Sequence, residues 1–177
     1  PGRPSAALAA RTSRLHIELL CAAPKGGENI ASLFNKIRDV IIESEGLIGY
    51  RLAPLLETVT ELGVVLGSLP GFDKLFETVV EVSSKRRGEI QAARLLVIRG
   101  LQCLDASRKY EAIRLFGRAL RRLYRNESRH ELVRALLSCA EAYEQIGLFW
   151  AARGALLAGA SVAAADLRKS ADVSSGL

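Results

Sequence analysis

Histidine, cysteine and clustered acidic side chains are the groups that most often carry acid–base or metal chemistry. This sequence has two histidines, His16 and His130, and no cluster of Ser, Cys or acidic residues is repeated around either. Its three cysteines, Cys21, Cys103 and Cys139, stand far apart rather than in the close pairs of a metal site. We therefore predict satisfied helix histidines and buried, reduced thiols. The same observations predict a protein that is not an enzyme and that needs no metal or cofactor.

Arginine is the side chain whose distribution indicates binding. Between Arg108 and His130 there are eight basic and two acidic residues, a net charge of +6 that equals the formal excess of the whole chain. A basic stripe recurs there at helical spacing, opposite the apolar positions Ala112, Phe116 and Ala119. It consists of Arg114, Arg118, Arg121, Arg122 and Arg125. The stripe is interpreted as a solvated face, as a site for an acidic protein segment, or as a contact for nucleic-acid backbone. No interleaved aromatic residues are present for base stacking, which argues against nucleic acid.

A repeat of forty residues organises the helices that carry these side chains. The residues that answer each other at this interval are Gly100 and Ala140, Cys103 and Tyr143, Ser107 and Gly147, Ala112 and Ala152, Phe116 and Leu156, and Ala119 and Gly159. Small residues let two helices approach, and large ones fill the space between them. A repeat of this length is a helical hairpin that cannot bury its own apolar face, so copies must stack. A weaker third copy precedes them, at an offset of 37.

At these residues the chain resembles the tetratricopeptide repeat family. The two segments that carry the resemblance are GLQCLDASRKYEAIRLFGRAL and AEAYEQIGLFWAARGALLAGA. The period of forty exceeds the family norm of about 34 residues, and the surplus falls near 123–129. HEAT-like repeats have a comparable length, so a generic α-solenoid remains the alternative.

The resemblance implies that the first helix of each hairpin lines a concave surface that binds a protein or peptide. The corresponding positions are Arg94, Val97, Leu101 and Leu104 in one repeat, and Arg134, Leu137, Glu141 and Glu144 in the next. Chaperone-binding members of the family have Lys and Asn where this chain has Val97 and Leu101. The chain therefore does not match their carboxylate clamp.

The predicted fold is all-α: a right-handed α-solenoid of about four antiparallel helical hairpins, forming a single domain over 1–177 with a frayed tail at 170–177. An apolar content of 49% with only 6% aromatic residues favours helix-on-helix packing. Helices are expected over 5–22, 29–45, 53–66, 72–82, 88–106, 108–124, from 128 onward and over 148–169, with a polar exit at 83–88. Ser128 and Glu131 form a predicted capping box, and Trp150 is predicted to wedge the last hairpin.

The sequence therefore predicts a non-catalytic interaction or scaffold module, part of a larger cytoplasmic protein, whose partner is a protein or peptide. No apolar run is long enough to span a bilayer, so no membrane association is expected. The helix over 148–169 has a surface of small apolar residues and no polar cap, which indicates possible self-association. The alternative is a nucleic-acid-binding helical repeat that acts through the basic stripe.

Overall fold

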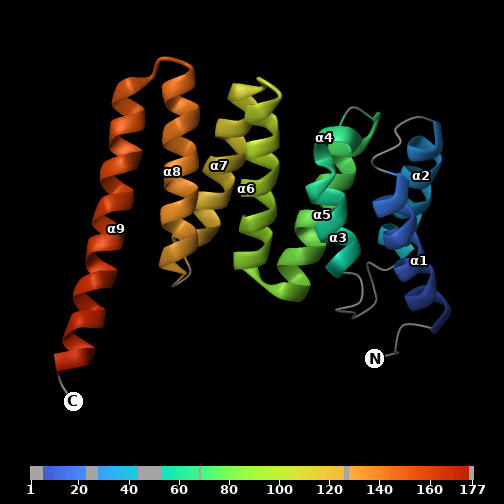
Figure 1. Cartoon of the computed structure of the whole chain (residues 1–177), viewed down its shortest axis with the longest axis horizontal. Coiled ribbons are helices and arrows are strands. Elements are labelled where there is room, and N and C mark those ends of the chain that lie inside the picture. Colours follow the sequence, from blue (N-terminus) through green and yellow to red (C-terminus); the bar gives the residue numbers. More distant parts are fainter. Residues whose placement is uncertain (1–5, 23–27, 44–52, 68, 126–127, 176–177) are drawn as a thin grey trace. The chain divides into compact units, whose positions relative to one another are not determined.

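The computed structural model describes residues 6–22, 28–43, 53–67, 69–125 and 128–175, and these contain helices and turns but no strand. The all-α prediction is confirmed for this part of the chain. The chain divides into two compact units, Pro1–Gly88 and Glu89–Leu177, whose helices are labelled in Figure 1. The single domain over 1–177 and the solenoid arrangement stay predictions.

The first unit is built from five helices among its described residues. They are α1 (Ala6–Ala22), α2 (Glu28–Glu43), α3 (Ala53–Glu61), the single turn α4 (Gly63–Leu66) and α5 (Phe72–Arg87). α1 packs against α2 and α3, and α5 contacts both α2 and α3. The apolar side of α2 is buried throughout: Ile30, Leu33, Phe34, Ile37, Val40 and Ile41. The ring centroids of Phe34 and Phe72 lie 6.4 Å apart, so aromatic contact joins α2 to α5.

His16 lies inside this unit and has a hydrogen-bond partner. Its Nδ1 is 2.8 Å from Oγ1 of Thr58, which links α1 to α3. The prediction of a satisfied helix histidine is confirmed for this residue. Cys21 differs from expectation, because it lies exposed near the end of α1, whereas Cys103 and Cys139 are buried as predicted.

Two helix boundaries in the first unit differ from the prediction. The continuous helix expected from Ala53 to Leu66 is broken at Leu62, whose ψ of 9° leaves the helical range, and a new turn begins at Gly63. The glycine weakens helix continuation there, since it costs about 1 kcal/mol relative to alanine. The segment 83–88, expected as a polar exit, instead continues α5 to Arg87. Three cations in its last turn stabilise the helix carboxyl end, and Gly88 with φ of 92° ends it.

The second unit consists of two helical hairpins that repeat each other's boundaries. Its helices are α6 (Glu89–Asp105), α7 (Lys109–Leu123), α8 (Arg129–Gln145) and α9 (Phe149–Ser175). α6 and α8 begin forty residues apart and end forty residues apart, and α7 and α9 begin at the same interval. α7 lies against both α6 and α8, and α9 lies against α8 (Figure 1). The predicted period is therefore confirmed in the helix boundaries of this unit. α9 also includes 170–175, which we expected to fray.

The turns inside the two hairpins have the same hydrogen bonds. The amides of Arg108 and Leu148 each bond the carbonyl five residues earlier, at 2.7 and 2.9 Å. The preceding residues, Ser107 and Gly147, adopt left-handed φ values of 61° and 79° and donate to the carbonyl three residues earlier. This is the Schellman motif, in which glycine is the preferred left-handed residue. Only the second repeat has that glycine.

We expect Ser107→Gly to stabilise the protein by about 0.5–1 kcal/mol, because glycine adopts the left-handed conformation without the clash of a β carbon. Gly147→Ser should destabilise it by a similar amount for the same reason. Urea unfolding of both variants measures the two changes. Opposite signs are required: a Ser107→Gly protein that is less stable than the parent would contradict this account of the turn.

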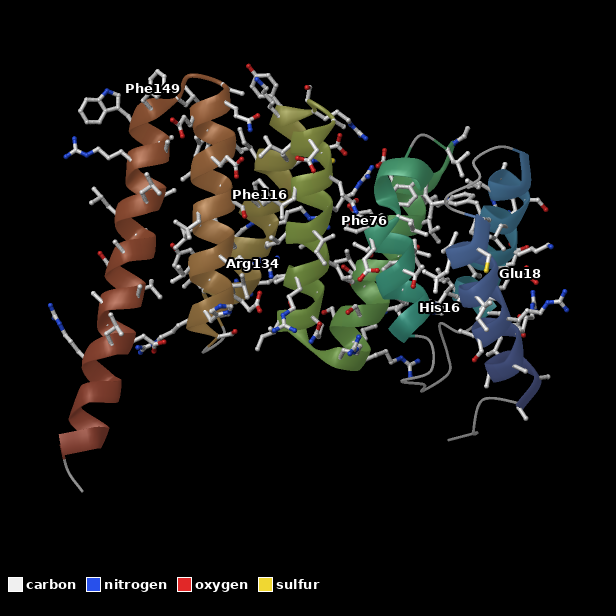
Figure 2. All side chains as sticks on the ribbon, viewed as in Figure 1. His16, Glu18, Phe76, Phe116, Arg134 and Phe149 are labelled. Carbon is white, nitrogen blue, oxygen red and sulfur yellow. The ribbon has the colours of Figure 1, made fainter. Side chains whose placement is uncertain are left out.

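Small and large residues meet between the helices as the repeat predicts. Phe116 of α7 is fully buried and packs onto Gly100 of α6, where an added β carbon would lie 2.8 Å from Cδ1 of the ring. In the next hairpin a β carbon on Gly159 of α9 would lie 3.7 Å from Cβ of Leu136, which is ordinary contact. Figure 2 labels Phe116 in this interior and Phe149 at the start of α9.

Trp150 does not wedge the last hairpin. Its side chain is 83% exposed, and the guanidinium of Arg153 lies 5.7 Å from the ring centroid. Trp150 occupies the second position of α9, on the side turned away from the buried Ala152 and Gly159. A cation–π contact on the surface replaces the predicted core contact.

Candidate functional site

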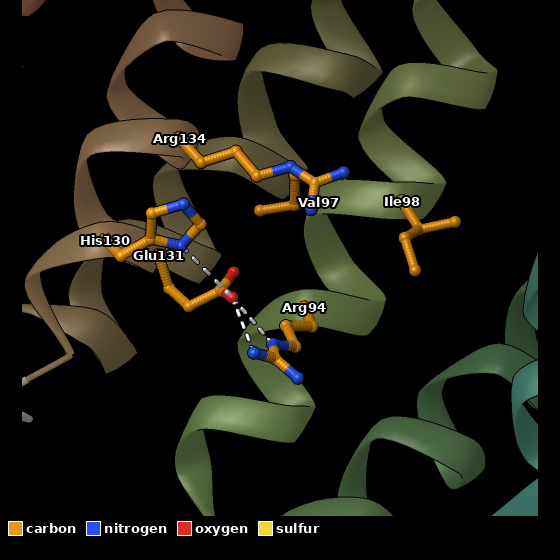
Figure 3. A pocket seen from close by; sticks show the side chains of 6 residues that line it. All are labelled: Arg94, Val97, Ile98, His130, Glu131 and Arg134. Atoms are coloured by element: carbon orange, nitrogen blue, oxygen red, sulfur yellow. Dashed lines mark hydrogen bonds and ion pairs between the residues drawn. The ribbon is translucent and has the colours of Figure 1, made fainter.

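A pocket opens between the first helices of the two hairpins in the second unit. α6 and α8 contact each other directly, and the cavity between them has a volume of about 370 Å³. Its lining, drawn in Figure 3, consists of Arg94, Val97 and Ile98 from α6 and His130, Glu131 and Arg134 from α8. We call this the α6/α8 pocket.

A buried carboxylate holds one of the pocket's cations in place. Glu131 is only 8% exposed at its side chain, and its Oε1 accepts a hydrogen bond from Nε of Arg94 at 2.8 Å and forms an ion pair with Nη2 at 2.7 Å. The predicted capping box is therefore wrong, since Ser128 makes no side-chain cap bond and Glu131 is directed to α6. A guanidinium forms stronger, charge-assisted hydrogen bonds than a backbone amide does. The pair fixes the Arg94 guanidinium at the pocket wall.

The other two polar groups of the pocket remain open to solvent. His130 is exposed, with Nδ1 3.8 Å from Oε1 of Glu131. Arg134 is also exposed, and it forms no ion pair with any described residue. Val97 and Ile98, both on α6, supply the apolar part of the lining (Figure 3). With two arginines and one carboxylate, the pocket has a net positive charge and suits an anionic group beside an apolar one.

One side of α8 continues from the pocket as an exposed surface, which we call the α8 face. Its members recur at intervals of four and three residues, so they lie on one side of the helix. They are His130, Arg134, Leu137, Glu141 and Glu144, and all five are exposed. Glu141 and Glu144 have no ion-pair partner among the described residues. Cations near the amino end and carboxylates near the carboxyl end oppose the helix dipole, so helix stability does not explain their order.

Five of the eight predicted concave positions are accessible. Arg94, Arg134, Leu137, Glu141 and Glu144 are exposed, and Leu101 is half-buried. Val97 and Leu104 are buried, although Val97 still lines the pocket.

The structure adds three residues that the sequence reasoning missed, Ile98, His130 and Glu131. The helical spacing could have found two of them. Ile98 lies one turn after Arg94, and His130 lies one turn before Arg134. Glu131 was assigned to a local cap, which concealed its contact with α6.

The predicted basic stripe divides into available and engaged arginines. Arg114, Arg121 and Arg125 are exposed and have no ion pair among the described residues. Arg122 pairs with Glu89, and Arg118 is half-buried with a contact of its own.

Three further basic residues of the segment from Arg108 to His130 also have partners. Arg108 pairs with Glu111, Arg129 pairs with Asp166 at 3.1 Å, and Nζ of Lys109 donates to the Gln145 carbonyl at 2.9 Å. Partners inside the chain therefore reduce the charge that the stripe can offer to a ligand.

Burial raises the pKa values of two neighbouring side chains on α8, Cys139 and Tyr143. Desolvation raises the pKa of the Cys139 thiol, and a hydrogen bond from the Tyr143 hydroxyl lowers it by a smaller amount. Desolvation also raises the pKa of Tyr143, with further increases from its interaction and hydrogen bond with Cys139. Both groups stay protonated in the folded chain at pH values where the unfolded chain loses these protons.

We expect stability to fall as the pH rises above about 8.5 to 10, the range in which unfolded Cys and Tyr ionise. The contribution is fully present below that range, because both folded pKa values are raised. Denaturant unfolding between pH 7 and pH 10.5 measures the slope. Cys139→Ala should flatten it, whereas Cys21→Ala, at an exposed thiol, should leave it unchanged; equal slopes in all three proteins would contradict the assignment.

Two other features, a metal site and a membrane-spanning helix, were sought in the part of the chain that the structure describes. No group of three or more His, Cys, Asp and Glu residues there could hold a metal ion. None of the helices described combines the length and apolar character needed to cross a bilayer.

Comparison with models of known protein families finds none that matches this sequence, and no curated protein is similar to it. The resemblance to tetratricopeptide repeats therefore stays a prediction.

Proposed function

We propose that the second unit is a non-catalytic protein-interaction module that binds a peptide segment of a partner on the α8 face and in the α6/α8 pocket. The observation that carries this proposal is the pocket itself, an open cavity of about 370 Å³ beside exposed charges that have no partner among the described residues. Binding energy would come from burial of Leu137 and the pocket wall, and specificity from the charges.

The repeat supports a larger architecture for this module. Two hairpins with the same period and the same turns are the units from which tetratricopeptide-like solenoids are built. We propose that the chain belongs to such a solenoid and serves as a docking or scaffold segment of a larger cytoplasmic protein. In such an arrangement the first helices, α6 and α8, present the binding surface.

Peptide selection tests the proposed function. A library of random peptides is selected on the full chain, and the enriched peptides are measured against Leu137→Asp. We expect at least about a tenfold loss, because a charge in an apolar contact costs more than 1.4 kcal/mol. Leu20→Asp on α1 is the matched control, since Leu20 is a surface leucine that is 49% exposed, against 48% for Leu137. Failure to enrich any peptide, or equal losses in both variants, would overturn the proposal.

Nucleic-acid binding through α7 is the second candidate, and the observation that favours it is the exposed set Arg114, Arg121 and Arg125. Backbone contacts release counterions, so binding must weaken steeply with salt. Titration of duplex and single-stranded nucleic acid at 50 and 200 mM salt tests this candidate. If three or more phosphate contacts form, the affinity should fall about tenfold or more between the two salt concentrations. Absence of salt-sensitive binding ends this candidate.

Self-association through α9 stays a prediction. Leu156, Leu157 and Leu167 are exposed on this helix, whereas Phe116, the repeat equivalent of Leu156, is fully buried. Sedimentation over a range of concentrations should show a mass above 19.2 kDa, and Leu157→Glu should restore the monomer. A monomer at high concentration in the parent chain would refute it.

A further inference from the structure

The α8 face carries its charges in a fixed order along the helix. Its amino-terminal end is basic, with Arg134 and His130 beside Arg94 of the pocket. Leu137, 48% exposed, follows one turn later. The carboxyl-terminal end is acidic, with Glu141 and Glu144. A ligand that lies along α8 therefore meets cations, an apolar side chain and carboxylates in succession.

The shape of the binding surface suits an extended ligand. The exposed residues of the α8 face recur along one side of α8, and the α6/α8 pocket of about 370 Å³ opens beside the amino-terminal end of that face. An extended peptide can place alternate side chains in the pocket and on the apolar contact.

The spacing of the face sets the spacing in the ligand. Helical rise places Leu137 about 4.5 Å and Glu144 about 15 Å beyond Arg134 along the axis. An extended chain advances about 3.3 to 3.6 Å per residue. The ligand residue that contacts Leu137 is therefore one or two positions along the peptide from the ligand residue that contacts Arg134. The ligand residue that contacts Glu144 is about four positions from the one at Arg134.

We propose that this surface selects peptides in which an acidic and a basic residue stand about four positions apart with an apolar residue between them. The acidic side chain lies at Arg134 and the α6/α8 pocket, and the basic side chain lies at Glu141 and Glu144. This inference rests on the proposed function and specifies its ligand. Segments with like charges at both ends are rejected, because one end then meets charges of its own sign.

Four synthetic eight-residue peptides labelled with a fluorophore test the order by anisotropy. All four contain the same apolar residue, and they differ in the charged residues on either side of it. Two peptides are mixed, with the order acid–apolar–base or base–apolar–acid, and two are like-charged, with the order acid–apolar–acid or base–apolar–base. One of the two mixed peptides should bind best, by about three- to tenfold over each like-charged peptide, with the advantage decreasing at high salt. The two mixed peptides differ only in chain direction, so their ranking gives the direction of the bound segment.

Charge reversal at one end of the α8 face must change the preferred peptide. Arg134→Glu should now favour base–apolar–base, and Glu141→Lys combined with Glu144→Lys should favour acid–apolar–acid. Arg121→Glu on α7 is the matched control, an exposed arginine that should leave the ranking as in the parent. Circular dichroism of each variant verifies that the helices remain.

The outcomes separate this inference from the proposed function. If library-selected peptides bind and are lost in Leu137→Asp, but the four peptides show no charge order or the reversals leave the ranking unchanged, the charge-order inference is wrong and the interaction surface stands. If neither the library nor the four peptides yield binding, both the charge-order inference and the proposed function are wrong.

Discussion

Gly100→Ala is expected to destabilise the protein by about 2 kcal/mol, although alanine is the better helix former. The added methyl would lie 2.8 Å from Cδ1 and 2.9 Å from Cζ of Phe116, closer than carbon atoms approach in folded proteins. The ring is fully buried, so it cannot move toward solvent. Because the clash is with several atoms of a buried ring, overpacking should cost about 3 kcal/mol, the upper end of its usual range, while the gain in helix propensity offsets about 1 kcal/mol. Urea unfolding followed by circular dichroism measures the difference.

Gly117→Ala provides the matched control for this substitution. Gly117 also lies within a helix, α7, but nothing lies within 4 Å of its added β carbon. The same chemical change should therefore stabilise the protein by about 0.5–1 kcal/mol through helix propensity alone. If both alanines stabilised the chain, the packing of Phe116 on Gly100 would be wrong.

The second repeat supplies a rescue for the first. Gly100 and Phe116 correspond to Ala140 and Leu156, so Gly100→Ala with Phe116→Leu gives these two positions the residue types of the second repeat. Phe116→Leu alone should cost about 1 kcal/mol, because it removes buried volume. The double variant should be at least about 1 kcal/mol more stable than the sum of the two single changes predicts, since the residues contact each other.

Arg94→Met should cost about 2 kcal/mol, considerably more than Glu131→Gln. Removal of the guanidinium leaves the carboxylate of Glu131, 8% exposed, without its charge partner, and an unsatisfied buried group costs about 1–3 kcal/mol. Glu131→Gln keeps an oxygen that accepts from Arg94, and Arg94, 47% exposed, retains water contact. The glutamine variant should therefore lose less than about 1 kcal/mol.

Arg129→Met is the control for the arginine change. Its partner Asp166 is 57% exposed, so water replaces the lost guanidinium and the expected cost is about 0.5 kcal/mol. Denaturant unfolding compares the three variants. Equal losses for the two methionine substitutions would show that the burial of Glu131 does not matter to stability.

Helix positions in the second unit were predictable because helical periodicity and turn chemistry are local properties. Ser107 and Gly147 were predicted at helix ends, and both adopt left-handed conformations there. Small and large residues were expected to meet between the helices, and the contact of Gly100 with Phe116 is one such meeting. These features needed no knowledge of what surrounds the helices.

The missed features depend on contacts between residues that are distant in the sequence. Glu131 satisfies a local capping pattern, yet Arg94, 37 residues earlier, provides stronger hydrogen bonds. Val97 and Leu104 occupy positions that the resemblance assigned to a binding surface, and both are buried. Trp150 and Cys21 are apolar by type but lie exposed. Residue type and spacing define the sides of a helix, whereas the neighbouring helices determine which sides are covered.

The length of α9 has a consequence for its amide protons. Asp166 of α9 pairs with Arg129, the first residue of α8, and α9 continues to Ser175, so its last turns run past the end of α8 (Figure 1). A short helical end is marginal in water, so we expect the backbone hydrogen bonds of these last turns to open without unfolding of the rest of the unit. Deuterium should enter their amides far sooner than it enters the amides around Phe116, which open only with the fold. Slower exchange in the overhang on addition of another macromolecule would report contact at this end of the helix.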